Sequence, residues 1–270
     1  WSTLHPEFAF LPRKFKIAIS GAAEDRAAIG WHDVGLQLVR NDAGEIGFKV
    51  LVGGGMGRTP IIGSVIREFL PWNQILVYLE AVVRVYNRYG RRDNAYKARI
   101  KILVKAEGQK YFDQVEAEFR QILENDPDGA LHLIPQAELD RVAACFTRPA
   151  GVEPLAEPAA DADAPLAYQR WLARNVHAHQ VPGWRAVTLS VKRAGQAPGD
   201  ATDAQLDAAA DLADRFSFGE LRVTHDQNLL LPWVRESDLL ALWEQAKAAS
   251  FAVPNIGLLS DMIACPGGDF

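Results

Sequence analysis

The chain has 270 residues, of which 49% are hydrophobic and 23% are charged, and its formal net charge is -5 at pH 7. That length supports a core and more than one folding unit, and the acidic balance argues against nucleic acid or an anionic membrane as a partner. Two cysteines, Cys145 and Cys265, exclude a disulfide scaffold and a local four-cysteine metal site. No apolar run reaches the ~18 residues that span a bilayer, so we expect a cytoplasmic protein.

The first predicted elements are two short strands and a glycine-rich loop. Residues 14–20 and 47–52 alternate charged and apolar side chains and include β-branched residues, which predicts strands. Residues 53–60 follow at once and contain four glycines. Such a stretch cannot form the interior of a strand, because glycine suits backbone that bends sharply or approaches a ligand closely.

A helix, a basic strand and a second helix are predicted next. Residues 71–89 carry an apolar stripe at helical spacing, with a proline at the start and a glycine after the end. The run KARIKILVK over 97–105 predicts a basic strand with Arg99 and Lys101 on one face. Acidic and apolar periodicity predicts a helix over 109–124.

The second half of the chain begins with a predicted linker. Residues 148–165 are dense in alanine, proline and acidic residues and have no apolar period. Beyond them a strand, a helix, a strand and a helix are predicted at 185–192, 204–216, 220–231 and 237–250. That order is typical of a small half-domain with helices on one face of a sheet. We therefore expect an α+β fold.

Two lysines near the start of the chain form the first candidate site. Lys14 and Lys16 are two residues apart, which places both on one face of the predicted strand. Both could simply face water. Alternatively, with Arg13 beside them, they could attract a small oxyanion and donate protons as its oxygens leave.

The glycine loop is a candidate site for a polyanion. Backbone N–H groups of Gly53, Gly54, Gly55 and Met56, together with the Arg58 guanidinium, could cradle such a ligand. A tight structural turn explains the same residues. The glycine spacing matches neither the Walker pattern nor the dinucleotide fingerprint.

A basic series runs from the end of the first predicted helix into the basic strand. Arginine forks suit a ligand with several carboxylates, whereas a solvated basic edge is the usual explanation of such a run. The members are Arg88, Arg91, Arg92, Lys97, Arg99 and Lys101.

Three further features of the sequence involve polar residues and cysteines. Residues 224–228 are polar and lie inside the predicted strand 220–231, where they would be costly unless paired with a ligand or a neighbouring loop. Cys145 lies in an apolar run and is predicted to belong to the core. Cys265 precedes a proline and two glycines, and such a cysteine is more often a buried thiol than a ligand.

Five stretches, taken in order, resemble the nitrite and sulfite reductase hemoprotein family: LPRKFKIAISGA, GFKVLVGGGMGRTP, EAVVRVYNRYGRRDNAYKARIKILV, RVTHDQNLLL and DMIACPGGDF. The resemblance spans most of the chain. It implies a siroheme and iron–sulfur type α+β domain over 1–147, a linker over 148–165 and a ferredoxin-like half-domain over 166–253. Residues 254–270 would begin a second siroheme-type domain.

The resemblance also implies roles for the candidate residues. Lys14 and Lys16 would bind the sulfite or nitrite anion and take part in its protonation. Siroheme would be bound by Arg13, Gly53, Gly54, Gly55, Met56, Arg58, Arg99, Lys101, Gln227 and Asn228. Cys265 matches the first of four cysteines that hold a [4Fe-4S] cluster. Because the other three are missing, we expect an internal piece of a longer protein, inactive by itself and without bound siroheme or cluster.

For the parent protein, the resemblance implies six-electron reduction of sulfite to sulfide. Electrons would come from a flavoprotein or a ferredoxin. The GRRDN region and the LPRKFK pair are similar to the bacterial sulfite-reducing group. Reduction of nitrite to ammonia is the first alternative, and a tetrapyrrole-binding scaffold without turnover is the second.

Overall fold

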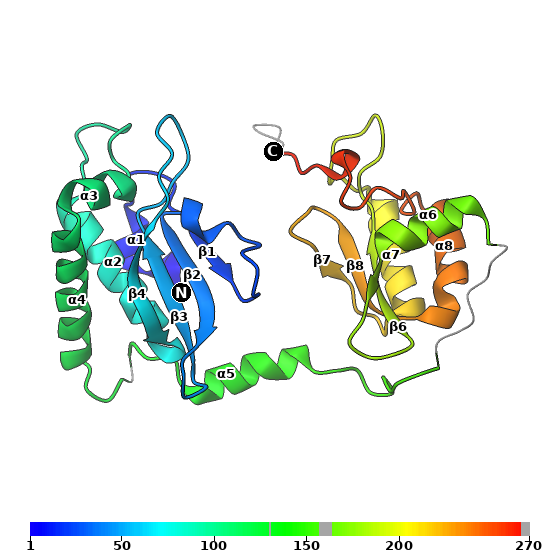
Figure 1. The fold of residues 1–270 in the computed structure, drawn as a ribbon, viewed down its shortest axis with the longest axis horizontal. Coiled ribbons are helices and arrows are strands. Elements are labelled where there is room, and N and C mark those ends of the chain that lie inside the picture. Colours follow the sequence, from blue (N-terminus) through cyan, green and yellow to red (C-terminus); the bar gives the residue numbers. More distant parts are fainter. Residues whose placement is uncertain (130, 157–163, 266–270) are drawn as a thin grey trace. The chain divides into compact units, whose positions relative to one another are not determined.

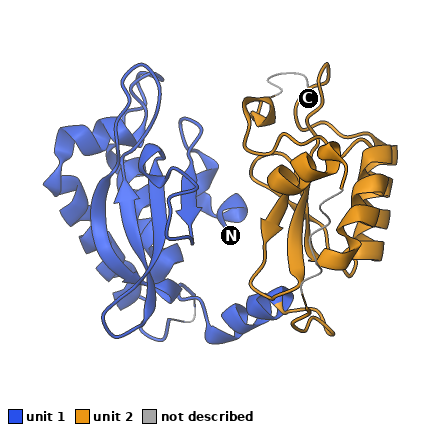
Figure 2. Cartoon of the chain, turned by 45° about the vertical axis from the view of Figure 1, so that its right-hand side comes forward, with its two compact units in different colours: residues 1–146 blue, residues 147–270 orange. Residues whose placement is uncertain are grey.

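Each of two units builds one four-stranded sheet with helices packed against it (Figures 1 and 2). The computed structural model describes residues 1–129, 131–156 and 164–265. Unit 1 is Trp1–Phe146 and unit 2 is Thr147–Phe270. The α+β fold class predicted from the sequence is confirmed. No helix in the described part of the chain is long and apolar enough to cross a membrane.

The sheet of unit 1 has the strand order β1-β2-β3-β4. Strand β1 (Ile17–Ser20) is parallel to β2 (Val34–Arg40). Strands β3 (Ile46–Val52) and β4 (Ser64–Pro71) continue the sheet in antiparallel fashion. The predicted strands 14–20 and 47–52 correspond to β1 and β3, but β1 begins only at Ile17, so Lys14 and Lys16 do not share a strand face as predicted. Strands β2 and β4 were not predicted.

Helices α2 (Ile75–Tyr89) and α4 (Gln109–Glu124) pack against this sheet (Figure 1). The buried face of α2 includes Val77, Ala81 and Val85, which follow one another at four-residue steps. These residues share one core with the sheet residues Val34, Leu36, Val50 and Val52. Both helices agree with the predictions for 71–89 and 109–124. Unit 1 also contains two shorter helices, α1 (Pro6–Ala9) and α5 (Gln136–Ala143).

The predicted basic strand over 97–105 is wrong, because the chain forms helix α3 (Ile100–Glu107) there. Ile100, Ile102 and Val104 gave the alternation of a strand. The apolar residues of α3 that are buried are Ile100, Leu103 and Val104, which is helical spacing. Arg99 is the N-cap residue of α3 and Lys101 lies in its first turn, so the two do not share a strand face.

The sheet of unit 2 is antiparallel with the order β5-β6-β8-β7. Its strands are β5 (Val176–Ala178), β6 (Trp184–Leu189), β7 (Arg222–Val223) and β8 (Leu229–Arg235). Helices α6 (Leu166–Asn175), α7 (Asp203–Phe216) and α8 (Leu239–Ala248) bury apolar side chains against it. Thr202 and Gln205 form a capping box that starts α7.

The predicted strand 220–231 is wrong in one respect, because it is a hairpin and not one strand. Residues 224–228 form the turn between β7 and β8, and the Thr224 N–H donates to the Asn228 carbonyl at 2.9 Å. Gln227 has a φ of 56°, in the left-handed region that a turn admits and a strand does not. The polar residues therefore do not sit in a strand interior.

Two other expectations also changed. Cys145 is exposed, not part of the core, because it follows the short helix α5 in a single 3-10 turn. Within the predicted linker, Val152 is buried against Val181 and Trp184 of unit 2. The Trp184 indole donates to the Glu153 carbonyl at 2.8 Å. Residues 157–163 lie outside the described residues.

Candidate functional site

Asp33 connects three segments of unit 1. Its carboxylate accepts hydrogen bonds from the Lys16 N–H at 3.0 Å and from Arg99 Nη2 at 3.2 Å. Its backbone carbonyl accepts from the Gly53 N–H at 2.9 Å. Only 2% of the residue is exposed. One buried acid thus connects the lysine segment, the glycine loop and the start of α3. Nothing in the sequence marked this acid as a connecting residue.

Lys14 and Lys16 precede β1 and are both exposed. Phe15, between them, is half-buried and packs on the core with its ring 5.9 Å from that of Tyr86. The Lys16 carbonyl accepts from the Val34 N–H at 3.1 Å, so the backbone is held on both sides. Among the described residues, neither ammonium has a hydrogen-bond or ion-pair partner. Two unpaired cations on fixed backbone can attract an anion.

The glycine loop, residues 53–60, approaches neighbouring parts of the chain so closely at Gly54 and Gly55 that a Cβ has no room there. A Cβ on Gly54 would lie 2.4 Å from the Gly30 carbonyl oxygen, and a Cβ on Gly55 would lie 2.5 Å from Arg99 Nη2. Gly55 and Ile61 exchange two backbone hydrogen bonds of 2.9 and 3.0 Å. The N–H groups of Gly53 and Gly55 are therefore already engaged inside the protein.

The side chains at the tip of the glycine loop are free to meet a ligand. Met56 and Arg58 are exposed. In the part of the chain that is described, the Arg58 guanidinium has no ion-pair partner. The loop therefore presents one cation and one apolar side chain to its surroundings.

Arg99 and Lys101 hold the glycine loop through hydrogen bonds to its backbone. Arg99 Nη1 donates to the Met56 carbonyl at 2.8 Å, in addition to the ion pair of Arg99 with Asp33. Lys101 Nζ donates to the carbonyl oxygens of Thr59 at 2.6 Å and Met56 at 3.2 Å. Burial, and then the charge of Arg99, lower the pKa of Lys101 from its ordinary value. The structure brings these two predicted residues to the loop, where their donors bind main-chain oxygens.

Most of the basic series is engaged in contacts within unit 1. Arg88 pairs with Glu118, and Arg91 pairs with Asp93. Arg92 donates to the Phe10 carbonyl at 2.7 Å, and Arg13 Nη1 donates to the Ala95 carbonyl at 2.9 Å. These contacts fasten the N-terminal segment to the stretch after α2. Lys97 is exposed.

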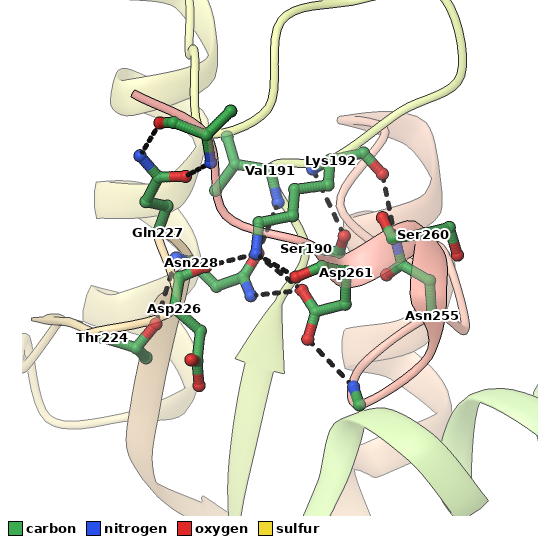
Figure 3. Close-up of polar contacts among 12 residues, drawn as sticks. Ser190, Val191, Lys192, Thr224, Asp226, Gln227, Asn228, Asn255, Ser260 and Asp261 are labelled. Carbon is green, nitrogen blue, oxygen red and sulfur yellow. Dashed lines mark hydrogen bonds and ion pairs between the residues drawn. The ribbon is translucent and has the colours of Figure 1, made fainter. Parts of the chain in front are cut away.

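The remaining predicted residues lie in unit 2. Gln227 and Asn228 bond to the segment that precedes Cys265 (Figure 3). Cys265 is exposed, as is Cys145 of unit 1. The described residues contain no group of three or more His, Cys, Asp or Glu side chains placed to hold a metal ion.

Two family descriptions match the chain in sequence order. Residues 1–123 match the nitrite and sulphite reductase 4Fe-4S domain. Residues 177–249 match the nitrite/sulfite reductase ferredoxin-like half domain. The two matches fall in unit 1 and unit 2 respectively.

Known reductases are similar to the chain. A sulfite reductase [ferredoxin] of Synechococcus elongatus is 37% identical over 118 residues, which is 41% of this chain and 19% of that protein. The chloroplastic ferredoxin–nitrite reductase of Oryza sativa is 27% identical over 98% of this chain and 39% of its own length. The hemoprotein beta-component of an NADPH sulfite reductase from Lysinibacillus sphaericus is 34% identical over 39% of this chain and 19% of its own.

A solved structure is also similar to the chain. The NirA protein of Mycobacterium tuberculosis matches with a TM-score of 0.60 and 25% identity, over 93% of this chain and 38% of that one. The matched regions thus span between about a fifth and two fifths of the length of these relatives.

Proposed function

The chain belongs to the siroheme-dependent nitrite and sulfite reductase family, and from that premise we propose that unit 1 binds sulfite beside a siroheme during its reduction to sulfide. The observation that carries the proposal is the pair of exposed ammonium groups on Lys14 and Lys16, which have no partner among the residues that the structure describes. Sulfite is a small anion, and two nearby cations compensate its charge. Each loss of oxygen requires protons where oxide develops, and an ammonium group can supply them.

The residues present suit a tetrapyrrole with several carboxylates. Arg58 offers a free guanidinium, whose fork matches a carboxylate in two-point fashion. Arg99 and Lys101 contribute by holding the loop of Gly53, Gly54, Gly55 and Met56 in shape. When bound, siroheme supplies the iron at which the oxyanion is reduced.

The residues present do not suit a complete iron–sulfur cluster. A [4Fe-4S] cluster takes four cysteine thiolates, and the sequence contains two cysteines, Cys145 and Cys265. Cys265 is proposed as one ligand. On the same count, the chain by itself is proposed not to assemble a cluster and not to reduce sulfite.

The electron donor is proposed to be a flavoprotein subunit or a ferredoxin, since relatives named for NADPH and for ferredoxin both match. Nitrite is the alternative substrate, and the match over 98% of the chain to a nitrite reductase favours it. Sulfite is preferred because the higher identity, 37%, is to a sulfite reductase.

The test replaces the two lysines in the siroheme-loaded protein that carries this chain. Lys14→Met and Lys16→Met should each lower the rate of sulfide formation roughly a hundredfold, the usual contribution of general acid catalysis. Lys110→Met, at an exposed lysine on α4 that pairs with Glu107, is the control and should keep the parent rate. Full activity in the doubly substituted protein would sink the proposal, and faster ammonia formation from nitrite would favour the alternative.

A further inference from the structure

Residues 251–265 follow α8 and lie on unit 2 with almost no regular structure of their own. Phe251 is fully buried, and its carbonyl accepts from the Ser190 N–H at 3.0 Å. Asn255 is also buried and donates from Nδ2 to the Lys192 carbonyl at 3.0 Å. A single 3-10 turn, Leu259–Asp261, comes next. The start of the segment is thus fixed to the residues that follow β6.

A buried ion pair holds the middle of the segment (Figure 3). Lys192 Nζ lies 2.8 Å from Asp261 Oδ1 and 2.7 Å from the Asp261 carbonyl oxygen, and it also donates to the Asp226 carbonyl. The two side chains are 2% and 7% exposed. An ammonium has three protons to donate, and here three acceptors receive them. Full satisfaction of both partners is the condition under which a buried pair is tolerated.

The Asp261 carboxylate has further donors on both oxygens. Asn228 Nδ2 donates to Oδ1 at 2.9 Å, and the Gly257 N–H donates to Oδ2 at 2.9 Å. Asn228 Oδ1 in turn accepts from the Val191 N–H at 3.1 Å. Burial would raise the pKa of Asp261, but the bonds from Lys192, Gly257 and Asn228 together lower it below its ordinary value. The carboxylate is therefore charged when the segment is in place.

Gln227 clasps the end of the segment through its side-chain amide. Nε2 donates to the Ala264 carbonyl at 2.7 Å, and Oε1 accepts from the Ala264 N–H at 2.9 Å. The clasp engages main-chain atoms only, so it fixes the backbone whatever side chain stands at 264. The next residue is Cys265, whose thiol is exposed.

We infer that Lys192, Gln227 and Asn228 are positioning residues that dock residues 255–264 on unit 2 and thereby fix the thiol of Cys265. They act through the backbone of the segment. That the fixed thiol serves a cluster rests on the proposed function. The docking itself rests on the contacts alone.

The direct test is amide hydrogen exchange at Ala264 in the chain as it stands. Gln227→Ala removes both bonds of the clasp and should speed exchange at Ala264 roughly tenfold, since two ordinary hydrogen bonds are lost. Amides of β8, such as that of Leu231, should keep the parent rate. Gln196→Ala, at an exposed glutamine in another loop, is the matched control. Unchanged exchange at Ala264 in Gln227→Ala would overturn the inference.

A second measurement follows the thiol itself. In a Cys145→Ser background, a nitroxide on Cys265 should give a broad, immobilised spectrum that narrows in Gln227→Ala and in Lys192→Met but not in Gln196→Ala. A spectrum already narrow in the parent would overturn the inference.

Neither measurement needs siroheme or cluster, so the docking and the proposed function can fail separately. If Ala264 responds as expected but Cys265→Ser leaves the iron content of the loaded protein unchanged, the ligand role fails and the docking stands. If Cys265→Ser removes iron while Gln227→Ala leaves amide exchange at Ala264 unchanged, the positioning role fails and the ligand role stands.

Discussion

The Asp33 carboxylate accepts bonds from two segments that border the candidate anion site. Its position explains why exposed lysines can sit on a defined backbone: the chain at Lys16 is bonded to Asp33 on one side and to β2 on the other. The exposed lysines and the buried acid that fixes their backbone are therefore parts of one local arrangement. The first effect of substituting Asp33 should be a loss of stability in unit 1.

Asp33→Ala should lower the free energy of unfolding of unit 1 by about 2 kcal/mol, because Arg99 and the Lys16 N–H lose a buried acceptor. The measurement is urea denaturation followed by a probe in unit 1. Asp42→Ala, at an exposed position in the turn between β2 and β3, is the control and should change stability by less than about 0.5 kcal/mol. Equal effects of the two substitutions would contradict the role given to Asp33.

At the scale of elements, the close packing of the glycine loop explains why glycine is needed there. A Cβ at Gly54 would meet Gly30 and His32, and a Cβ at Gly55 would meet Arg99. That leaves ligand contact to the side chains at the tip of the loop, Met56 and Arg58. The loop and α3 act together, since Arg99 and Lys101 bond to the loop carbonyls.

Gly54→Ala should destabilise unit 1 by about 3 kcal/mol, because the new Cβ would meet main-chain oxygens of Gly30 and His32 that cannot move aside cheaply. Gly21→Ala adds the same group where nothing lies within 4 Å, so it should be close to neutral. Thermal unfolding of the two variants decides the point. A Gly54→Ala protein as stable as Gly21→Ala would show that the loop is looser than described.

The docked segment of unit 2 should respond to acid. The folded-state pKa of Asp261 lies below the ordinary value of 3.8, so the carboxylate contributes stability above that value and loses it as pH falls through the lower folded-state value. Exchange at Ala264 should therefore stay slow, apart from intrinsic chemistry, from pH 7 to about 4. Below that pH it should quicken before β8 opens.

Asp261→Asn should abolish this acid response, because the amide has no charge to lose. The substitution also turns an N–H donor toward the Gly257 N–H, where the carboxylate oxygen accepted a hydrogen bond. The other charged groups nearby are Lys192 and the exposed pair His225 and Asp226, whose atoms lie 3.4 Å apart. A variant that kept the parent's acid response would contradict its assignment to Asp261.

Over the whole molecule, the sequence pattern predicted the features that depend on residues close together in the chain. The helices α2, α4 and α7 and the α+β class followed from periodicity, since their apolar residues recur at helical spacing. Strand β2 was missed because Gly35 interrupts it, yet that glycine is required where a Cβ would lie 2.3 Å from the Ile29 carbonyl oxygen. Helix α3 was mistaken for a strand because isoleucine and valine fit both periods.

The contacts that order the candidate residues could not be predicted, because they join distant parts of the sequence. Lys192 and Asp261 are 69 positions apart, and Asp33 and Arg99 are 66 apart. A sequence shows that a lysine is present but not that an acid will be buried beside it. For the same reason the predicted roles of Lys14 and Lys16 stay predictions that the variants above must test.

The two units have separate cores, since the residues that pack around Leu36 and those that pack around Leu231 form clusters with no member in common. Leu36→Ala and Leu231→Ala each empty a fully buried site and should cost about 3 kcal/mol. If each unit unfolds on its own, exchange of core amides should quicken by about two orders of magnitude only in the unit that carries the change. Because each substitution serves as the other's control, an equal loss of protection in both units would show that the chain unfolds as one cooperative body.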